Sequence, residues 1–167
     1  MSSGLGDFHL SKKAREKLKN KDALKKEFEE GKSAQEILGF SDKSMAEFYN
    51  AAYRLFNHKR YGDAANAFLF LVTLNSYNYD YWLGLGMSAQ MCKEYDLSID
   101  AYEMAAVTKP DSPVPYFYLS KCFFATHDRE NALNALDLAL EYSEASEEYS
   151  DLRNQALAAK KILKKEL

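Results

Sequence analysis

The sequence repeats with a period of 34 residues, and this feature limits its possible folds more than any other. Three segments, 45–78, 79–112 and 113–146, align in register. Each has an aromatic residue at its fourth position, small residues at its eighth and twentieth, and a large apolar residue at its twenty-fourth. This period is typical of a helix–turn–helix unit that buries its apolar face only by stacking on neighbours. The sequence therefore predicts an all-α fold, an α-solenoid of stacked helix hairpins.

The repeat pattern resembles the tetratricopeptide repeat, and the second copy matches it best. The small residues are expected to let the two helices of a hairpin approach closely, while the large ones fill the space beside that contact. The seventeenth position is Tyr61 in the first copy, Tyr95 in the second and Arg129 in the third, so the third copy departs from the aromatic pattern. In the three copies the fourth position holds Phe48, Trp82 and Tyr116, and the eighth holds Ala52, Gly86 and Ser120. The twentieth position holds Ala64, Ser98 and Ala132, and the twenty-fourth holds Phe68, Tyr102 and Leu136.

Local signals place the helix ends. Ser44 to Glu47 reads as a capping box at the start of the first repeat helix. Asn78, Ser112 before a proline, and Asp128 are expected to cap three later helices. No segment alternates with a period of two, so no sheet is expected. The expected helices span 45–58, 61–74, 79–92, 95–108, 113–126 and 129–142.

The flanks form two further parts, an N-terminal helical extension at 1–44 and a C-terminal capping helix at 147–167. A short element at 34–40 is expected to pack under the first repeat. The helix at 147–165 is expected to cover the last repeat, as the ends of such arrays require. The residues predicted to cover it are Leu152, Ala156, Ala159, Ile162 and Leu163.

Residues 11–32 are locally basic and carry an apolar stripe at helical spacing. One interpretation is a helix that binds a membrane surface or a calmodulin-like partner. The other, which we favour because five acidic residues interrupt the basic face, is a charged helix that docks on its own chain or on a second copy. The stripe predicted to support a homodimer consists of Leu10, Ala14, Leu18, Leu24 and Phe28.

Composition and motifs argue against catalysis, nucleic-acid binding and membrane insertion. The net charge is −3, whereas nucleic-acid-binding domains are usually basic. The longest apolar run, 67–72, is far shorter than the roughly 20 residues of a membrane span. His9, His58 and His127 are scattered, and Cys92 and Cys122 fall inside predicted helices, where a buried apolar role is expected. The sequence therefore predicts a cytosolic protein that is not an enzyme and holds no metal or cofactor.

The first helix of each hairpin is expected to line the concave side of the stack, and its inward positions are unusually apolar and aromatic. These side chains could be ordinary core, or be covered by the N-terminal segment. Alternatively they form a groove for an extended peptide, because Tyr and Phe offer large contact areas with few torsions to freeze and Met adapts to varied side chains. The predicted peptide-binding residues are Tyr49, Tyr53, Phe56, Asn57, Asp80, Leu83, Met87, Gln90, Met91, Phe117, Lys121 and Phe124.

Some tetratricopeptide proteins bind the C-terminal tail of heat-shock chaperones through a carboxylate clamp, which needs Lys and Asn at the fifth and ninth positions. Among the six equivalent residues here only Lys121 could serve. That class of partner is therefore disfavoured.

Longer stretches make the chain similar to a known family, the class II chaperones of bacterial type III secretion of the LcrH/SycD type. The resemblance covers roughly residues 30–165. It is carried by FYNAAYRLF at 48–56 with KRYGDA at 59–64, YWLGLG at 81–86 and EYDLSIDAY at 94–102.

The resemblance implies a small ATP-independent chaperone that holds hydrophobic translocator proteins before export. Such chaperones bind an extended segment containing proline and leucine in their concave groove, and the groove aromatics of the family fall on Tyr49, Tyr53 and Phe56. Many members self-associate through the N-terminal helix. A generic repeat scaffold in a larger complex is the alternative, whereas an enzyme or regulator has no supporting residues.

Overall fold

The computed structural model describes residues 11–165, and within that range every regular element is a helix. The predicted all-α fold is confirmed. The chain divides into two compact units, Met1–Tyr77 and Asn78–Leu167, so the division falls one residue before the predicted boundary between the first and second repeats. None of the helices in this range combines the length and the apolar character that crossing a bilayer requires.

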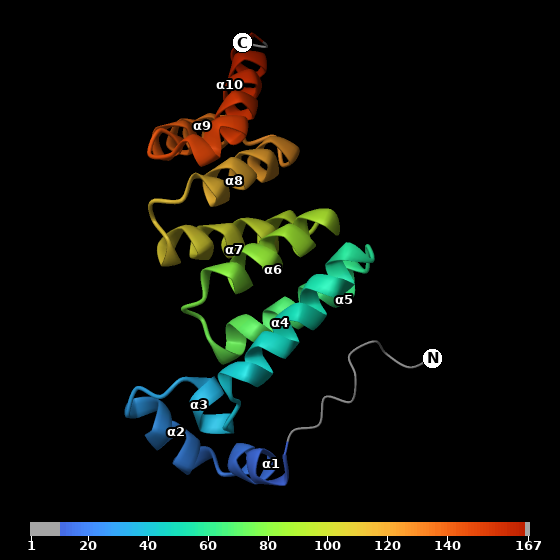
Figure 1. The fold of residues 1–167 in the computed structure, drawn as a ribbon, viewed down its shortest axis with the longest axis vertical. Coiled ribbons are helices and arrows are strands. Elements are labelled where there is room, and N and C mark those ends of the chain that lie inside the picture. The colour runs from blue at the N-terminus through green and yellow to red at the C-terminus, as the bar shows by residue number, and fades with distance from the viewer. Residues whose placement is uncertain (1–10, 166–167) are drawn as a thin grey trace. The chain divides into compact units, whose positions relative to one another are not determined.

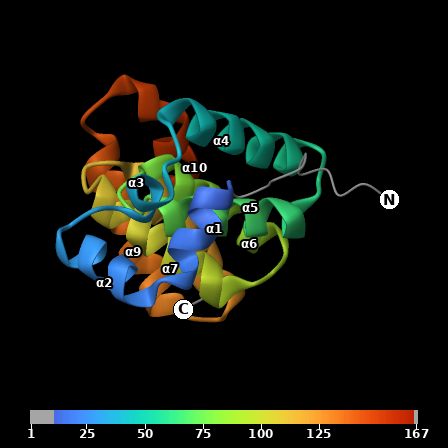
Figure 2. The same cartoon turned by 90° about the horizontal axis from the view of Figure 1, so that it is seen from below.

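The first unit contains five helices in its described part (Figure 1). Figure 2 shows α5 returning beside α4 as the second arm of a hairpin. The helices are α1 (Lys12–Lys19), α2 (Lys21–Glu29), α3 (Ala34–Leu38), α4 (Asp42–Asn57) and α5 (Tyr61–Leu74).

The basic segment at 11–32 forms two helices. Asn20 interrupts it, and its Oδ1 atom accepts a hydrogen bond from the backbone N–H of Ala23 at 3.1 Å, which caps α2. The predicted stripe is therefore divided between α1 and α2. Ala14 is buried, Leu24 is half-buried, and Leu18 and Phe28 are exposed.

The helix that opens the first hairpin begins a turn before the predicted position. Ser41 is its N-cap, and the Oγ atom of Ser41 accepts a hydrogen bond from the backbone N–H of Ser44 at 3.1 Å. The predicted capping box at Ser44 is therefore wrong. A capping box occurs instead at α3, where Ser33 and Glu36 bond reciprocally to each other's backbone.

The element at 34–40 packs under the first hairpin, as predicted. Ile37 is buried, and its carbonyl accepts a hydrogen bond from Nζ of Lys17 at 2.8 Å. The ring of Phe40 lies edge-on to the rings of Phe48 and Phe70, with centroids 5.5 and 6.4 Å away. Such edge-to-face aromatic contacts tie the extension to both arms of the hairpin.

The second unit consists of two hairpins and a C-terminal helix (Figure 1). The predicted caps are confirmed, since Asn78, Ser112 and Asp128 each accept a hydrogen bond from a backbone N–H of the first helical turn. The elements are α6 (Tyr79–Met91), α7 (Tyr95–Thr108), α8 (Pro113–Ala125), α9 (Arg129–Ser143), a short 3₁₀ helix (Glu147–Tyr149) and α10 (Ser150–Lys165).

The small residues of the repeat mark where the helices of a hairpin meet. A Cβ atom added at Gly86 would lie 2.6 Å from Cε1 of Tyr102, whose side chain is fully buried. The hydroxyl of Ser98 donates a 2.7 Å hydrogen bond to the carbonyl of Gly86. In the first hairpin the equivalent Ala52 and Ala64 are also fully buried. The predicted close approach is therefore confirmed in both units.

The turn inside each hairpin has the same backbone geometry. Its fifteenth repeat position adopts a left-handed conformation, with φ of 60° at Lys59, 62° at Lys93 and 63° at His127. The next backbone N–H reaches back across the helix end, which closes the last turn as in a Schellman motif. These bonds join Arg60 to Leu55, Glu94 to Ala89 and Asp128 to Phe123.

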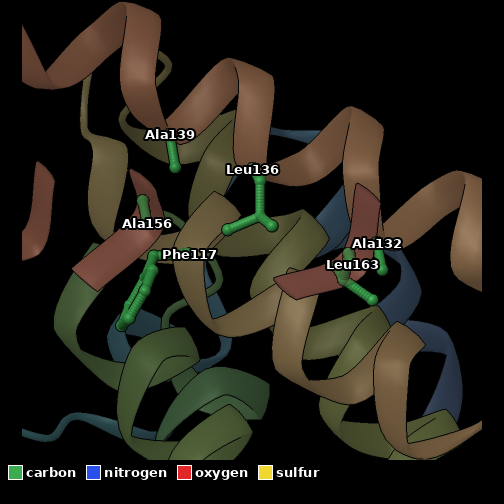
Figure 3. Close-up of a cluster of buried hydrophobic side chains, with 6 residues drawn as sticks. All are labelled: Phe117, Ala132, Leu136, Ala139, Ala156 and Leu163. Carbon is green, nitrogen blue, oxygen red and sulfur yellow. The ribbon is translucent and has the colours of Figure 1, made fainter. Parts of the chain in front are cut away.

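The C-terminal helix closes the second unit over a core built from three helices. Figure 3 shows the six buried side chains of this cluster, with Leu136 of α9 projecting toward the other helices. Arg129, the residue that departs from the repeat pattern, donates a hydrogen bond to the carbonyl of Leu163 near the end of α10. The third copy therefore uses its seventeenth position to hold the capping helix. The cluster comprises Phe117, Ala132, Leu136, Ala139, Ala156 and Leu163.

Candidate peptide-binding surfaces

The predicted peptide-binding residues of the first unit lie along α4, and we call them the α4 face: Tyr49, Tyr53, Phe56 and Asn57. The rings of Tyr49 and Tyr53 are stacked, with centroids 6.2 Å apart and planes 28° apart. Tyr49 is half-buried and also meets the ring of buried Phe68 edge-on at 6.0 Å. Tyr53 is 51% exposed. Tyr49 therefore packs against the core on one side and against Tyr53 on the other, and the ring of Tyr53 is exposed and available to a partner.

The other two residues of the α4 face, Phe56 and Asn57, lie at the C-terminal end of α4, next to the turn into α5. Phe56 is half-buried, and its ring meets that of Tyr61 edge-on at 5.2 Å. Asn57 is the exposed last residue of α4. The α4 face thus offers an open aromatic side chain, two partly covered ones and a polar end.

In the second unit the predicted residues of α6 form the α6 face: Asp80, Leu83, Met87, Gln90 and Met91. Leu83 and Met87 are half-buried against the core that surrounds Tyr102. The hydroxyl of Tyr102 donates a 2.8 Å hydrogen bond to Oε1 of Gln90, which fixes that side chain. Met91 and Asp80 are exposed. Leu83 and Met87 are therefore partly committed to core packing, while Met91 is the most open apolar side chain of this face.

The predicted residues of α8 separate into one core residue and two surface residues. Phe117 is only 7% exposed because α9 and α10 cover it. Phe117 is therefore core in this structure, and its part in peptide binding stays a prediction. Lys121 and Phe124 remain exposed.

A groove in the second unit was not predicted from the sequence. It has a volume of about 220 Å³, lies between α8, α9 and α10, and has almost entirely apolar walls. Ile162, predicted to cover the last repeat, is instead 57% exposed and lines this groove. The sequence carries no clear signal for this groove: consecutive helical residues point about 100° apart, and such a pair can be buried together, as Leu71 and Val72 are in α5. The lining residues are Ser120, Lys121, Phe124, Leu136, Ala159, Ile162 and Leu163.

Lys121 is the charged residue of this α8–α10 groove. Its Nζ atom lies 4.3 Å from the ring centroid of Phe117 and 5.1 Å from that of Tyr118, which are cation–π distances. Desolvation by the surrounding apolar side chains lowers the pKa of Lys121, because burial disfavours the charged form of a lysine.

Two observations concern the titratable groups of residues 11–165. No group of three His, Cys, Asp or Glu side chains in this range could hold a metal ion. Burial raises the pKa of both the Cys92 and the Cys122 thiol, so neither is activated as a thiolate nucleophile. Cys122 is fully buried, as predicted, whereas Cys92 is half-buried beyond the end of α6.

The residues predicted for dimerisation do not form one continuous surface in the described range. Leu10 lies outside the described residues. Ala14 is buried in the first unit, and its part in an interface stays a prediction. Leu18 and Phe28 are 44% and 54% exposed and remain available.

Known proteins match this chain over most of its length. No family model matches it. The chain is 28% identical to the chaperone protein SicA of Salmonella typhimurium over 135 residues, which make up 81% of this chain and 79% of SicA. It is 27% identical to the low calcium response locus protein H of Yersinia pestis over 124 residues, 74% of each chain. The resemblance inferred from the sequence is confirmed.

Solved structures agree with these relatives. One is the type III secretion translocator chaperone SycD of Yersinia enterocolitica in complex with a peptide of the translocator YopD. That structure is 26% identical, has a TM-score of 0.73, and covers 75% of this chain and 96% of SycD. A second SycD structure, described as an alternative dimer, is 27% identical with a TM-score of 0.73 and covers 75% of this chain and 96% of SycD.

Proposed function

We propose that this chain, a homologue of SicA and of the low calcium response protein H, is a type III secretion chaperone. It binds an extended apolar segment of a translocator protein that contains proline and leucine, and it keeps that client soluble and competent for export. The observation that carries the proposal is the likeness to SycD, which binds a peptide of the translocator YopD and matches three quarters of this chain.

The exposed side chains of the helix hairpins support such a role. A pore-forming client carries apolar segments that aggregate in water, and burying one large apolar side chain contributes roughly 1.5–3 kcal/mol before ordering costs. The α4 face offers the stacked Tyr49 and Tyr53, and the α6 face offers Met91 beside half-buried Met87. A few such anchors are enough for micromolar binding, at roughly −8 kcal/mol.

A chaperone of this kind catalyses no reaction and requires no cofactor, and it acts in the bacterial cytoplasm before export. The net charge of −3 supports solubility of the complex. The alternative is a generic repeat scaffold inside a larger assembly. The two functions differ in the state of the partner, which is unfolded and apolar for a chaperone and folded for a scaffold.

Substitution on the α4 face tests the proposal. The chain is co-expressed with the translocators of its own secretion system, and captured proteins are identified by mass spectrometry. Tyr53→Ala is expected to reduce the captured translocator about tenfold, which corresponds to about 1.4 kcal/mol of lost contact. Tyr77→Ala is the matched control, because Tyr77 lies in the same unit, is 86% exposed and lies outside the α4 face.

Equal capture by the wild type and by Tyr53→Ala would contradict the role of the α4 face. Capture of folded soluble proteins alone, without a translocator, would favour the scaffold. Far-UV circular dichroism of each variant shows whether the helices are retained.

We also propose that the exposed part of the N-terminal stripe supports a homodimer. Leu18 and Phe28 are the members of the stripe that remain exposed on α1 and α2. Light scattering of a Leu18→Ser, Phe28→Ser variant is expected to give a smaller mass than the wild type. Leu69→Ser is the control, because Leu69 is 46% exposed on α5 of the same unit. An unchanged mass of the double variant, or an equal loss in the control, would count against this interface.

A further inference from the structure

The α8–α10 groove combines apolar walls with a single charged side chain. Phe124 and Ile162 are 53% and 57% exposed, so they leave apolar surface uncovered at the groove. Lys121 is the only charged residue among the groove's lining residues. The groove therefore suits a ligand that carries an apolar group and a negative charge close together.

Lys121 has no acidic partner among the described residues. The contacts of its ammonium group are the aromatic rings of Phe117 and Tyr118, and desolvation lowers its pKa without an opposing carboxylate. A purely apolar ligand placed over this group would remove still more water from the charge and leave it without a counter-charge, which is costly. A carboxylate at the same place would compensate the charge and raise the pKa of Lys121.

The helices on both sides of the groove extend this positive character. The α8 sequence contains no Asp or Glu, and in α10 the only acid, Asp151, lies in the first turn. At the other end of α10, Lys161, Lys164 and Lys165 are exposed. Lys160 is neutralised by an ion pair with Asp137 of α9. The third helix at the groove, α9, is acidic, with Glu130, Asp137 and Glu141. The positive charge is therefore confined to the α8 and α10 side of the groove, where it favours an acidic ligand.

We propose that the α8–α10 groove is a specificity site for the client, and that it accepts a large apolar side chain whose neighbour along the client chain is Asp or Glu. The apolar side chain packs against Phe124 and Ile162, and the carboxylate pairs with Lys121. This inference rests on the proposed chaperone function. It adds to that function a charge requirement at one position of the bound segment.

A second copy of this chain suits the groove less well. The groove of about 220 Å³ holds only one or two side chains. A stable dimer interface needs about 800 Å² from each partner. The groove therefore fits one anchor of a longer segment that makes its other contacts elsewhere.

Selection from a random library of short displayed peptides tests the site without knowledge of the natural client. The full chain is the bait, and the selected peptides are sequenced. The wild type is expected to enrich Asp or Glu beside a large apolar residue by about tenfold over the unselected library. Lys121→Glu is expected to reverse that preference to Lys or Arg at the same position. Lys121→Met, which keeps an apolar stem over Phe117, is expected to abolish the charge preference and retain the apolar one.

Lys109→Glu is the matched control, because Nζ of Lys109 lies over the ring of Tyr79 at 5.4 Å in the same unit, outside the groove. It is expected to select the same peptides as the wild type. Ile162→Ser, at the groove wall, is expected to weaken the apolar preference next to the acid about tenfold.

Three results would overturn the inference. Selection of apolar peptides with no preference for an acidic neighbour would contradict the charge requirement but would remain consistent with the chaperone function. No selected peptides at all would count against the chaperone function and the groove together. A change of oligomeric mass in Lys121→Glu or Ile162→Ser, without a change in peptide preference, would assign the groove to a second copy of this chain.

Discussion

The first helices of two hairpins, α4 and α8, follow the same repeat pattern and yet present different surfaces. At the fifth repeat position α4 places Tyr49, which supports exposed Tyr53, whereas α8 places Phe117, which is buried. At the ninth position the corresponding residues are Tyr53 and Lys121, both exposed. The difference arises because α10 packs against α8. A repeat position therefore fixes where a side chain points, but the neighbouring element decides whether it is available to a partner.

The largest effect that separates the two helices is expected from Phe117→Ala. Phe117 packs in the cluster with Leu136 and Leu163, so truncation removes core contacts and leaves a cavity. The expected loss of unfolding free energy is about 3–5 kcal/mol. Tyr53→Ala on α4 is expected to lose less than about 1 kcal/mol, because half of that side chain is already in water. Urea unfolding followed by far-UV circular dichroism measures both.

Equal losses in the two variants would remove the distinction between a closed α8 and an open α4. A stable Phe117→Ala variant that also lost peptide binding would support the prediction that Phe117 belongs to the binding surface. Phe117→Leu is a milder variant that keeps an apolar side chain, should the alanine variant fail to fold.

The fold could be predicted because its determinants are local or periodic. The 34-residue period located the hairpins, and Asn78, Ser112 and Asp128 each cap a helix through a bond within four residues of sequence. The capping box at Ser44 failed because Ser41 offers the same chemistry one turn earlier. Asn20 interrupts the N-terminal helix by the same kind of bond, which the apolar stripe alone did not indicate.

The candidate surfaces were less predictable, because exposure depends on contacts between residues distant in sequence. Arg129 looked like a defect of the third repeat, yet its guanidinium bonds to the carbonyl of Leu163, 34 residues away. The burial of Phe117 depends on that same placement of α10. Repeat position predicted that Tyr53 lines the concave side, and its side chain is 51% exposed. Repeat position could not report that Phe117, in the last repeat, is covered by the C-terminal helix.

A substitution of intermediate effect tests whether the close contact between the two helices of a hairpin requires a small residue at the eighth repeat position, as the 34-residue pattern implies. Gly86→Ala puts a methyl group 2.6 Å from the fully buried ring of Tyr102, so either the ring or the helices must shift. The expected loss is about 1–3 kcal/mol of unfolding free energy. Gly62→Ala is the control, because no atom lies within 4 Å of its added Cβ and alanine favours the helix, so a gain of up to about 1 kcal/mol is expected. A neutral Gly86→Ala variant would mean that the ring can move and that the contact is loose.

The smallest effect is expected at the hairpin turns, where α4 and α8 end in the same way. Lys59 and His127 occupy the same repeat position with φ of 60° and 63°, a conformation that costs a residue with a Cβ roughly 1–2 kcal/mol. Glycine relieves that cost but loses more conformational entropy on folding. Lys59→Gly and His127→Gly are therefore each expected to gain up to about 1 kcal/mol, measured as a rise in the urea midpoint at unchanged slope. A similar gain in both variants would show that the two hairpins share their turn energetics and differ only in what covers their first helix. A gain in one variant and a loss in the other would mean that the difference between α4 and α8 begins in the turn itself.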